Sequence, residues 1–115
     1  MALLQATHRD AGSVTVVDLS GRITLGEGSA LLRNTIRELL DEKRFKILLN
    51  LADINYIDSA GIGELVSAYT AVKNRGGDLK LLNLTKKVHD LMQITRLFTV
   101  FEVHSNEAAA LQSFS

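Results

Sequence analysis

The chain has 115 residues, of which 46% are hydrophobic and 23% charged, and its 13 basic side chains balance 13 acidic ones. This length predicts one globular domain with its own hydrophobic core and leaves no room for a second. Cysteine is absent, which excludes disulfides, zinc thiolates and thiol nucleophiles. The charges are balanced and the sequence contains no basic stripe, so we expect no nucleic-acid partner.

The apolar segments of the chain are short and interrupted by charged residues. None approaches the roughly 20 residues that are needed to span a bilayer, so no direct membrane insertion is expected. The polar run His8-Arg9-Asp10 comes too early in the chain for the preceding residues to form a signal peptide. The sequence therefore predicts a soluble cytoplasmic protein.

Two β-rich segments open the chain. Residues 3–7 and 13–19 are predicted strands, and the short turn between them favours an antiparallel pair. Residues 21–24 end the second strand. From residue 25 to about residue 41 the period becomes helical, with these positions on one face: Leu25, Ser29, Leu32, Ile36, Leu39 and Leu40. Residues 45–51 then carry apolar side chains on both sides, which is typical of a strand covered on both faces.

The second half alternates helices and strands. The predicted elements are a loop over 52–57, a helix over 58–75, a strand over 79–84, a helix from Thr85 to about Thr95, a short strand over 100–103 and a final helix capped by 105–107 and reaching Leu111. The order β-β-α-β-α-β-α-β-α predicts an α/β fold. We expect a mixed, mostly parallel sheet of four to five strands with about four helices.

Residues 58–64 are the segment best suited to a function, because they follow a buried strand and open a helix. Asp58 and Ser59 are favoured helix N-caps, and a capping role alone would explain them. The alternative is that the Ser59 hydroxyl is exposed and modified. Gly61 and Gly63 favour this second interpretation, since they let another molecule approach closely while weakening the first helical turn.

Motifs of enzymes and metal sites are incomplete. A hydrolase nucleophile elbow needs glycine two residues before the serine, where Ile57 stands. No Gly-Lys-Ser/Thr phosphate loop is present, and the Gly-x-Gly pairs lack the third glycine of a dinucleotide fingerprint. Histidines occur without partners at metal-ligand spacing, at His8, His89 and His104. No catalytic residue, metal or cofactor is therefore predicted.

Residues 49–63 combine an apolar strand, an acidic loop and the run Ile57-Asp58-Ser59-Ala60-Gly61-Ile62-Gly63. This segment resembles the STAS domain of bacterial anti-sigma-factor antagonists, whose signature is apolar-Asp-Ser/Thr-small-Gly-apolar-Gly. The Val-rich second strand, the glycine pair before residue 79 and residues 88–103 extend the resemblance over nearly the whole chain. The resemblance implies a single STAS domain over residues 1–115.

The resemblance also implies a function. In that family the serine matching Ser59 is phosphorylated by an anti-sigma factor that is also a serine protein kinase, and a PP2C-type phosphatase removes the phosphate. The unphosphorylated form binds the kinase, frees the sigma factor and so regulates transcription. The partner-binding residues implied here are Thr24, Asp58, Ser59, Gly61, Ile62 and Gly63. At Thr24 the chain departs from many relatives, which carry an acidic residue there.

A phosphate on Ser59 is expected to switch binding by local repulsion, because Asp58 and Glu64 would surround it with negative charge. The fold would tolerate this phosphate, because a helix N-terminus favours a negative charge. Two other functions remain open. One is a scaffold subunit of a sensory complex or an accessory subunit of a membrane transport system. The other is an enzyme acting through Ser59 and His89.

Overall fold

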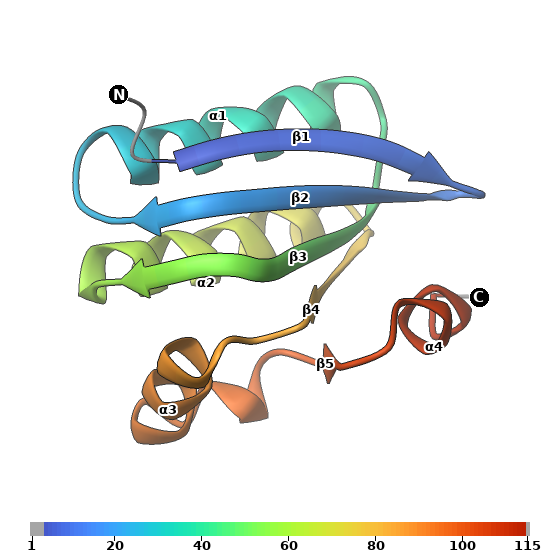
Figure 1. Cartoon of the computed structure of the whole chain (residues 1–115). Helices are drawn as coiled ribbons and strands as arrows, with labels where there is room; N and C mark the ends of the chain where they lie inside the picture. Colours follow the sequence, from blue (N-terminus) through green and yellow to red (C-terminus); the bar gives the residue numbers. More distant parts are fainter. Residues whose placement is uncertain (1–3, 115) are drawn as a thin grey trace.

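The computed structural model describes residues 4–114 and contains a five-stranded sheet with four α-helices (Figure 1). The elements are β1 (Leu4–Ala11), β2 (Val14–Ile23), α1 (Glu27–Asp41), β3 (Lys46–Ile57), α2 (Ser59–Asn74), β4 (Asp78–Leu82), α3 (Lys86–Ile94), the short 3-10 helix η1 (Leu97–Thr99), β5 (Val103–His104) and α4 (Glu107–Gln112). The predicted α/β class and element order are confirmed. Residue 3, the predicted start of the first strand, lies outside the described residues.

The sheet has the strand order β1-β2-β3-β4-β5. β1 pairs with β2 antiparallel, whereas the other three pairs are parallel, as predicted for a mixed, mostly parallel sheet. Each crossover advances by one strand in the same direction, so right-handed connections place α1, α2 and α3 on one face. In Figure 1, α1 and α2 lie behind the sheet. Within residues 4–114, no helix is long and apolar enough to cross a membrane.

Two apolar clusters stabilise the sheet, one on each face. The larger cluster joins the strands to the helices through buried side chains that include Leu32 of α1, Leu65 of α2 and Val88 of α3. The smaller cluster lies on the other face, under α4, and consists of Val14, Val16, Leu48, Leu82, Ala110 and Phe114. Leu48 belongs to the smaller cluster and its neighbour Leu49 to the larger one. The third strand is therefore covered on both faces, as its sequence predicts.

β3 continues through residues 52–57, which the sequence predicts as a loop. Their polar composition is misleading, because Ile54 and Ile57 are buried while the residues between them face solvent. The backbone of this segment pairs with the end of β2, where Ile23 lies opposite Ile57. Two register shifts in this pairing break the strict alternation of a regular strand, so the usual pattern of a strand is absent from the sequence.

Other boundaries also differ from the predictions. α1 begins at Glu27 rather than at residue 25, because Gly26 has a φ of 98° that does not fit a helix. Leu25 consequently lies in the β2–α1 loop with 79% of its surface exposed, instead of facing the core. The last strand, β5, is reduced to two residues. Residues 100 and 101 belong to the preceding turn, since both their N–H groups donate to the Leu97 carbonyl.

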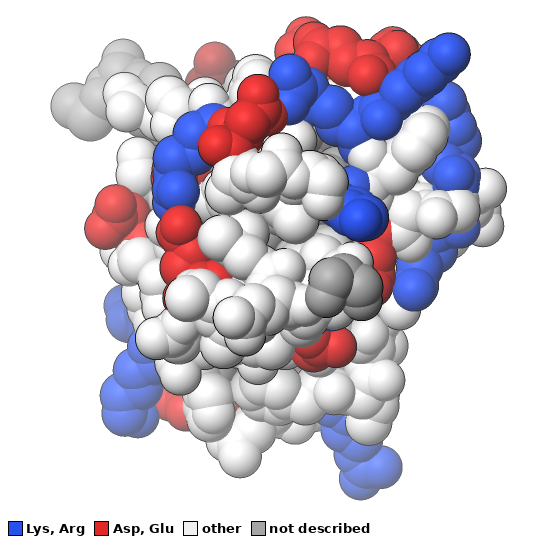
Figure 2. Space-filling model, turned by 90° about the vertical axis from the view of Figure 1, so that its right-hand side faces the viewer, with Lys and Arg blue, Asp and Glu red and all other residues white. Residues whose placement is uncertain are grey.

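The end of the molecule with the β1–β2 turn and α4 carries basic and acidic side chains next to one another (Figure 2). Arg44 contacts the Asp10 carboxylate, and its Nε donates to Oε1 of Glu42 at 2.9 Å. These two carboxylates, Asp10 first, raise the pKa of Arg44. The charges at this end therefore compensate one another locally.

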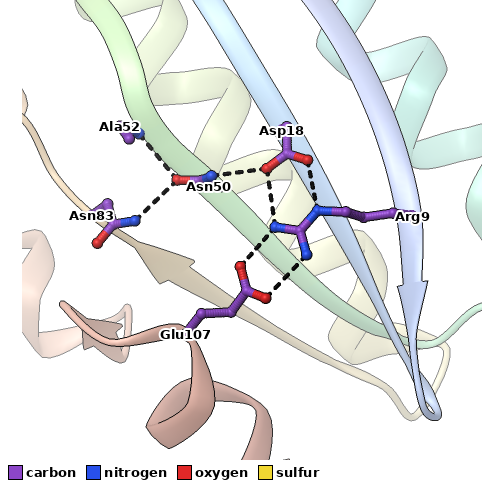
Figure 3. A network of polar contacts seen from close by, with 6 residues as sticks. All are labelled: Arg9, Asp18, Asn50, Ala52, Asn83 and Glu107. Atoms are coloured by element: carbon purple, nitrogen blue, oxygen red, sulfur yellow. Dashed lines mark hydrogen bonds and ion pairs between the residues drawn. The ribbon is translucent and has the colours of Figure 1, made fainter.

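A polar network joins α4 to the β1–β2 hairpin (Figure 3). The guanidinium of Arg9 binds Asp18 (Nε to Oδ2, 2.9 Å) and Glu107 (Nη2 to Oε1, 2.6 Å). Asp18 also accepts from Nδ2 of Asn50 at 2.8 Å, and Oδ1 of Asn50 accepts from Nδ2 of Asn83 at 3.4 Å. Glu107 and then Asp18 raise the pKa of Arg9, which in turn lowers the pKa of both carboxylates. The network thus links three neighbouring strands to the last helix.

Replacing Arg9 with alanine should lower the free energy of unfolding by about 1 kcal/mol, because the lost side chain joins two carboxylates on different elements. The control is Lys86→Ala, which removes a 3.0 Å pair with Asp90 inside α3 and should leave stability unchanged. Urea unfolding of both variants measures the difference. Equal stability of the two variants would show that Arg9 does not fasten α4.

Candidate functional site

The carboxyl ends of β2 and β3 lie side by side, and the loops that follow them lead into α1 and α2 (Figure 1). Asp58 connects these two loops. Its Oδ1 accepts the Gly61 N–H at 2.8 Å, and its Oδ2 accepts the Leu25 N–H at 3.1 Å. The N–H groups of Gly61 and then Leu25 lower the pKa of Asp58. The predicted N-cap is therefore confirmed, and the same carboxylate also fixes the β2–α1 loop.

Gly61 allows the end of β2 to pack directly on the first turn of α2. A Cβ atom at this position would lie 2.1 Å from the Ile23 carbonyl oxygen and 2.7 Å from Cγ1 of Ile57. Only glycine fits such an approach. At Gly63, by contrast, a Cβ atom would meet nothing within 4 Å. The two glycines of the motif thus have different roles: Gly61 is required by packing, whereas Gly63 leaves an open surface.

Ser59 is the first residue of α2, and its side chain is exposed. Within residues 4–114 its hydroxyl has no hydrogen bond to another side chain. The neighbouring Asp58 caps the helix, so Ser59 is not needed for capping. An accessible hydroxyl at a helix N-terminus is what a modification of this residue requires.

The six residues implied as a partner surface differ in exposure. Ser59 and Gly63 are exposed, Asp58 and Thr24 are half-buried, and Gly61 and Ile62 are buried. The Thr24 carbonyl accepts from the backbone N–H and the hydroxyl of Ser29, at 3.0 and 2.8 Å. The buried residues thus pack under the carboxyl ends of β2 and β3, and the exposed residues are accessible at the surface there.

The sequence predicts that Glu64 and Asp58 form an acidic patch beside Ser59, but the structure does not place Glu64 in such a patch. Its Oε1 accepts from Nε of Arg33 in α1 at 2.8 Å, and only 12% of its side chain is exposed. The negative charge of Glu64 is therefore compensated. Asp58 is the carboxylate that adjoins Ser59 directly.

Sequence reasoning missed the exposed apolar side chains around this site. The sequence predicts Leu25 on the core face of a helix and Tyr56 in a loop, whereas in the structure both side chains are exposed. Tyr56 is 44% exposed, and the Arg22 guanidinium lies over its ring at 5.9 Å from the centroid. For Leu25 a signal existed, because the following Gly26 disfavours a helix at this point.

The enzyme alternative requires Ser59 and His89 to act together. His89 lies in α3, where its Nδ1 is 3.6 Å from Oδ1 of Asp90 and its ring packs on Phe98 with centroids 5.2 Å apart. No hydrogen bond joins it to Ser59 among the described residues. Over the same residues, 4–114, no group of three or more histidine and acidic side chains is arranged to hold a metal ion.

Comparison with known proteins places this geometry in a family. The family model described as STAS domain matches residues 5–110. The chain belongs to the STAS domain family. The anti-sigma F factor antagonist of Paenibacillus polymyxa is 27% identical over 94% of this chain and 92% of its own length. The anti-sigma-B factor antagonist of Bacillus subtilis (strain 168) is 29% identical over 84% of this chain and 86% of its own.

A solved structure confirms the STAS fold. The phosphorylated form of the Bacillus cell fate determinant SpoIIAA superposes with a TM-score of 0.72, covering 95% of this chain and 99% of the other, at 17% identity. At this identity the likeness establishes the fold alone. The predicted family and the predicted mixed α/β sheet are both confirmed for this STAS domain.

The two glycines of the STAS motif should respond in opposite ways to alanine. Gly61→Ala should destabilise the domain by about 3 kcal/mol, because its Cβ would clash with the Ile23 carbonyl. Gly63→Ala should stabilise the domain by about 0.5 kcal/mol, because alanine favours the helix and the position is open. Thermal unfolding of the two variants provides the measurement. A neutral Gly61→Ala would contradict the close approach described above.

The Asp58 bonds predict a pH dependence. The folded-state pKa lies below the ordinary value of 3.8, so the carboxylate contributes stability above pH 3.8 and loses it as the pH falls toward the folded pKa. The stability difference between the unsubstituted protein and Asp58→Asn should therefore be largest near neutral pH and shrink below pH 3.8. Denaturant unfolding at a series of pH values tests this. A difference that does not vary with pH would exclude the capping carboxylate as its source.

Proposed function

We propose that this STAS domain is an anti-sigma factor antagonist controlled by phosphorylation of Ser59. In its unphosphorylated form it binds an anti-sigma factor that is also a serine protein kinase, and it thereby regulates transcription in the cytoplasm. The observation that carries this proposal is the exposed Ser59 hydroxyl at the start of α2, beside the capping Asp58. The names of the two relatives, both anti-sigma factor antagonists, support it.

The fold would tolerate a phosphate on Ser59. Phosphoserine carries about −1.5 to −2 charges at neutral pH, and a helix N-terminus favours an anion through its free N–H groups and its dipole. The side chain is exposed, so no buried group has to move. A switch that works by unfolding the domain is therefore disfavoured.

Docking of a partner is more sensitive to the phosphate than the fold is. Asp58 is ionised at neutral pH, since its pKa is lowered, and it adjoins Ser59. A partner surface that fits a neutral hydroxyl would have to desolvate a doubly charged group next to this carboxylate. A penalty of about 3 kcal/mol weakens binding roughly a hundredfold. Repulsion at the site is therefore sufficient, without help from Glu64, whose charge is paired with Arg33.

The same exposure supports the reverse reaction. A phosphoserine at the first residue of a helix stands clear of the core, so a PP2C-type phosphatase could reach it without unfolding the domain. In the proposed cycle two partners act at the Ser59 hydroxyl, the kinase and the phosphatase, and the sigma factor responds through the kinase.

The proposal predicts opposite effects of two substitutions at Ser59. Ser59→Ala should keep binding to the kinase, whereas Ser59→Asp should weaken it about a hundredfold, because only the second adds a negative charge. The matched control is Ser67→Asp, which places the same charge at an exposed serine of the same helix and should bind normally. Calorimetric titration against each purified anti-sigma factor kinase of the source organism measures the affinities.

Equal binding by Ser59→Ala and Ser59→Asp, with both variants folded, would refute the switch. Mass spectrometry after incubation with kinase and ATP should find the phosphate on Ser59 and not on Ser67. Light scattering of the same samples distinguishes the scaffold alternative, which requires assembly of the chain into a large particle.

A further inference from the structure

Leu25 is exposed beside the proposed phosphorylation site. Its exposed fraction is 79%, a value that in the described part of the chain is matched by Ile94 at the end of α3. Single exposed aliphatic side chains are common on protein surfaces, so exposure alone carries no functional meaning. The distinctive feature of Leu25 is how its backbone is held.

The β2–α1 loop is fixed on both sides of Leu25. The Leu25 N–H donates to Oδ2 of Asp58 at 3.1 Å, and the carbonyl of the preceding Thr24 accepts two hydrogen bonds from Ser29. Gly26 then takes a φ of 98°, which turns the chain into α1. The exposed side chain is thus presented from an ordered backbone. A residue held in this way loses less conformational entropy when it binds than one on a loose loop.

Leu25 and Ser59 are connected through one carboxylate. Oδ1 of Asp58 caps α2, the helix that begins with Ser59, while Oδ2 holds the Leu25 N–H. Both residues are exposed, and their backbones lie at the carboxyl ends of β2 and β3, where Asp58 joins the two loops. A partner that covers the Ser59 hydroxyl therefore approaches the loop that carries Leu25.

We propose that Leu25 is the apolar anchor of this docking surface and that the partner has an apolar pocket which receives it. The inference rests on the proposed function, because the occupant is the same anti-sigma factor kinase. An apolar contact inside a polar rim is the usual anatomy of a protein interface. Here Leu25 supplies the apolar contact, and Ser59 with Asp58 supplies the polar rim. Burial of the Leu25 side chain provides affinity, and the charge state of Ser59 decides whether the two surfaces close.

Leu25→Ala should weaken binding to the kinase at least tenfold, which corresponds to about 1.4 kcal/mol. Leu25→Met, which keeps an apolar side chain of similar volume, should bind within about threefold of the unsubstituted chain. Ile94→Ala is the matched control, because it truncates an aliphatic side chain of equal exposure at another place, and it should leave binding unchanged. The titrations use the anti-sigma factor kinase that binds the unsubstituted chain. Circular dichroism verifies that each variant is folded.

Each of the following results would overturn the anchor. Binding of Leu25→Ala within twofold of the unsubstituted chain would show that the side chain is not buried by the partner. An equal loss for Ile94→Ala would show that the effect is not specific to this surface. If Ser59→Asp abolishes binding while Leu25→Ala preserves it, the proposed function survives without the anchor. If no kinase of the source organism binds the unsubstituted chain, both proposals fail.

Discussion

The two oxygens of the Asp58 carboxylate serve two different segments, and the geometry of the site depends on this division. One oxygen caps α2 through the Gly61 N–H, and the other holds the Leu25 N–H of the loop before α1. The contact is possible because Gly61 lacks a side chain and lets the Ile23 carbonyl approach the helix. Strand, helix and loop are thus brought together at one point, and the exposed hydroxyl of Ser59 stands beside it.

The fold separates this site from the parts that stabilise it. The larger apolar cluster lies between the sheet and α1 to α3, and the smaller cluster with the Arg9 network fastens α4 on the other face. Charge added at the first residue of α2 touches neither cluster. This arrangement lets a surface group change its charge while the core stays the same, which is the physical requirement for a switch that acts on docking alone.

The residues of the STAS motif divide into a surface and its support. Ser59 and Gly63 are accessible to another molecule, whereas Gly61 and Ile62 are buried and determine where the accessible residues lie. A substitution at a buried position would therefore affect binding through the shape of the site. The exposed Leu25 comes from a segment more than thirty residues earlier in the chain, and the Asp58 contact joins its backbone to the same end of the molecule.

Local chemistry in the sequence predicted the order of the elements, the two-sided burial of β3 and the Asp58 cap, because periodicity and capping depend on residues close together in the chain. The motif also located Ser59 at the start of a helix. Only the tertiary structure decided that residues 52–57 form a strand, that the Leu25 N–H bonds to Asp58 and that Glu64 pairs with Arg33. These features depend on contacts between segments distant in sequence. Neither composition nor spacing shows which backbone or side chain will be the partner in such a contact.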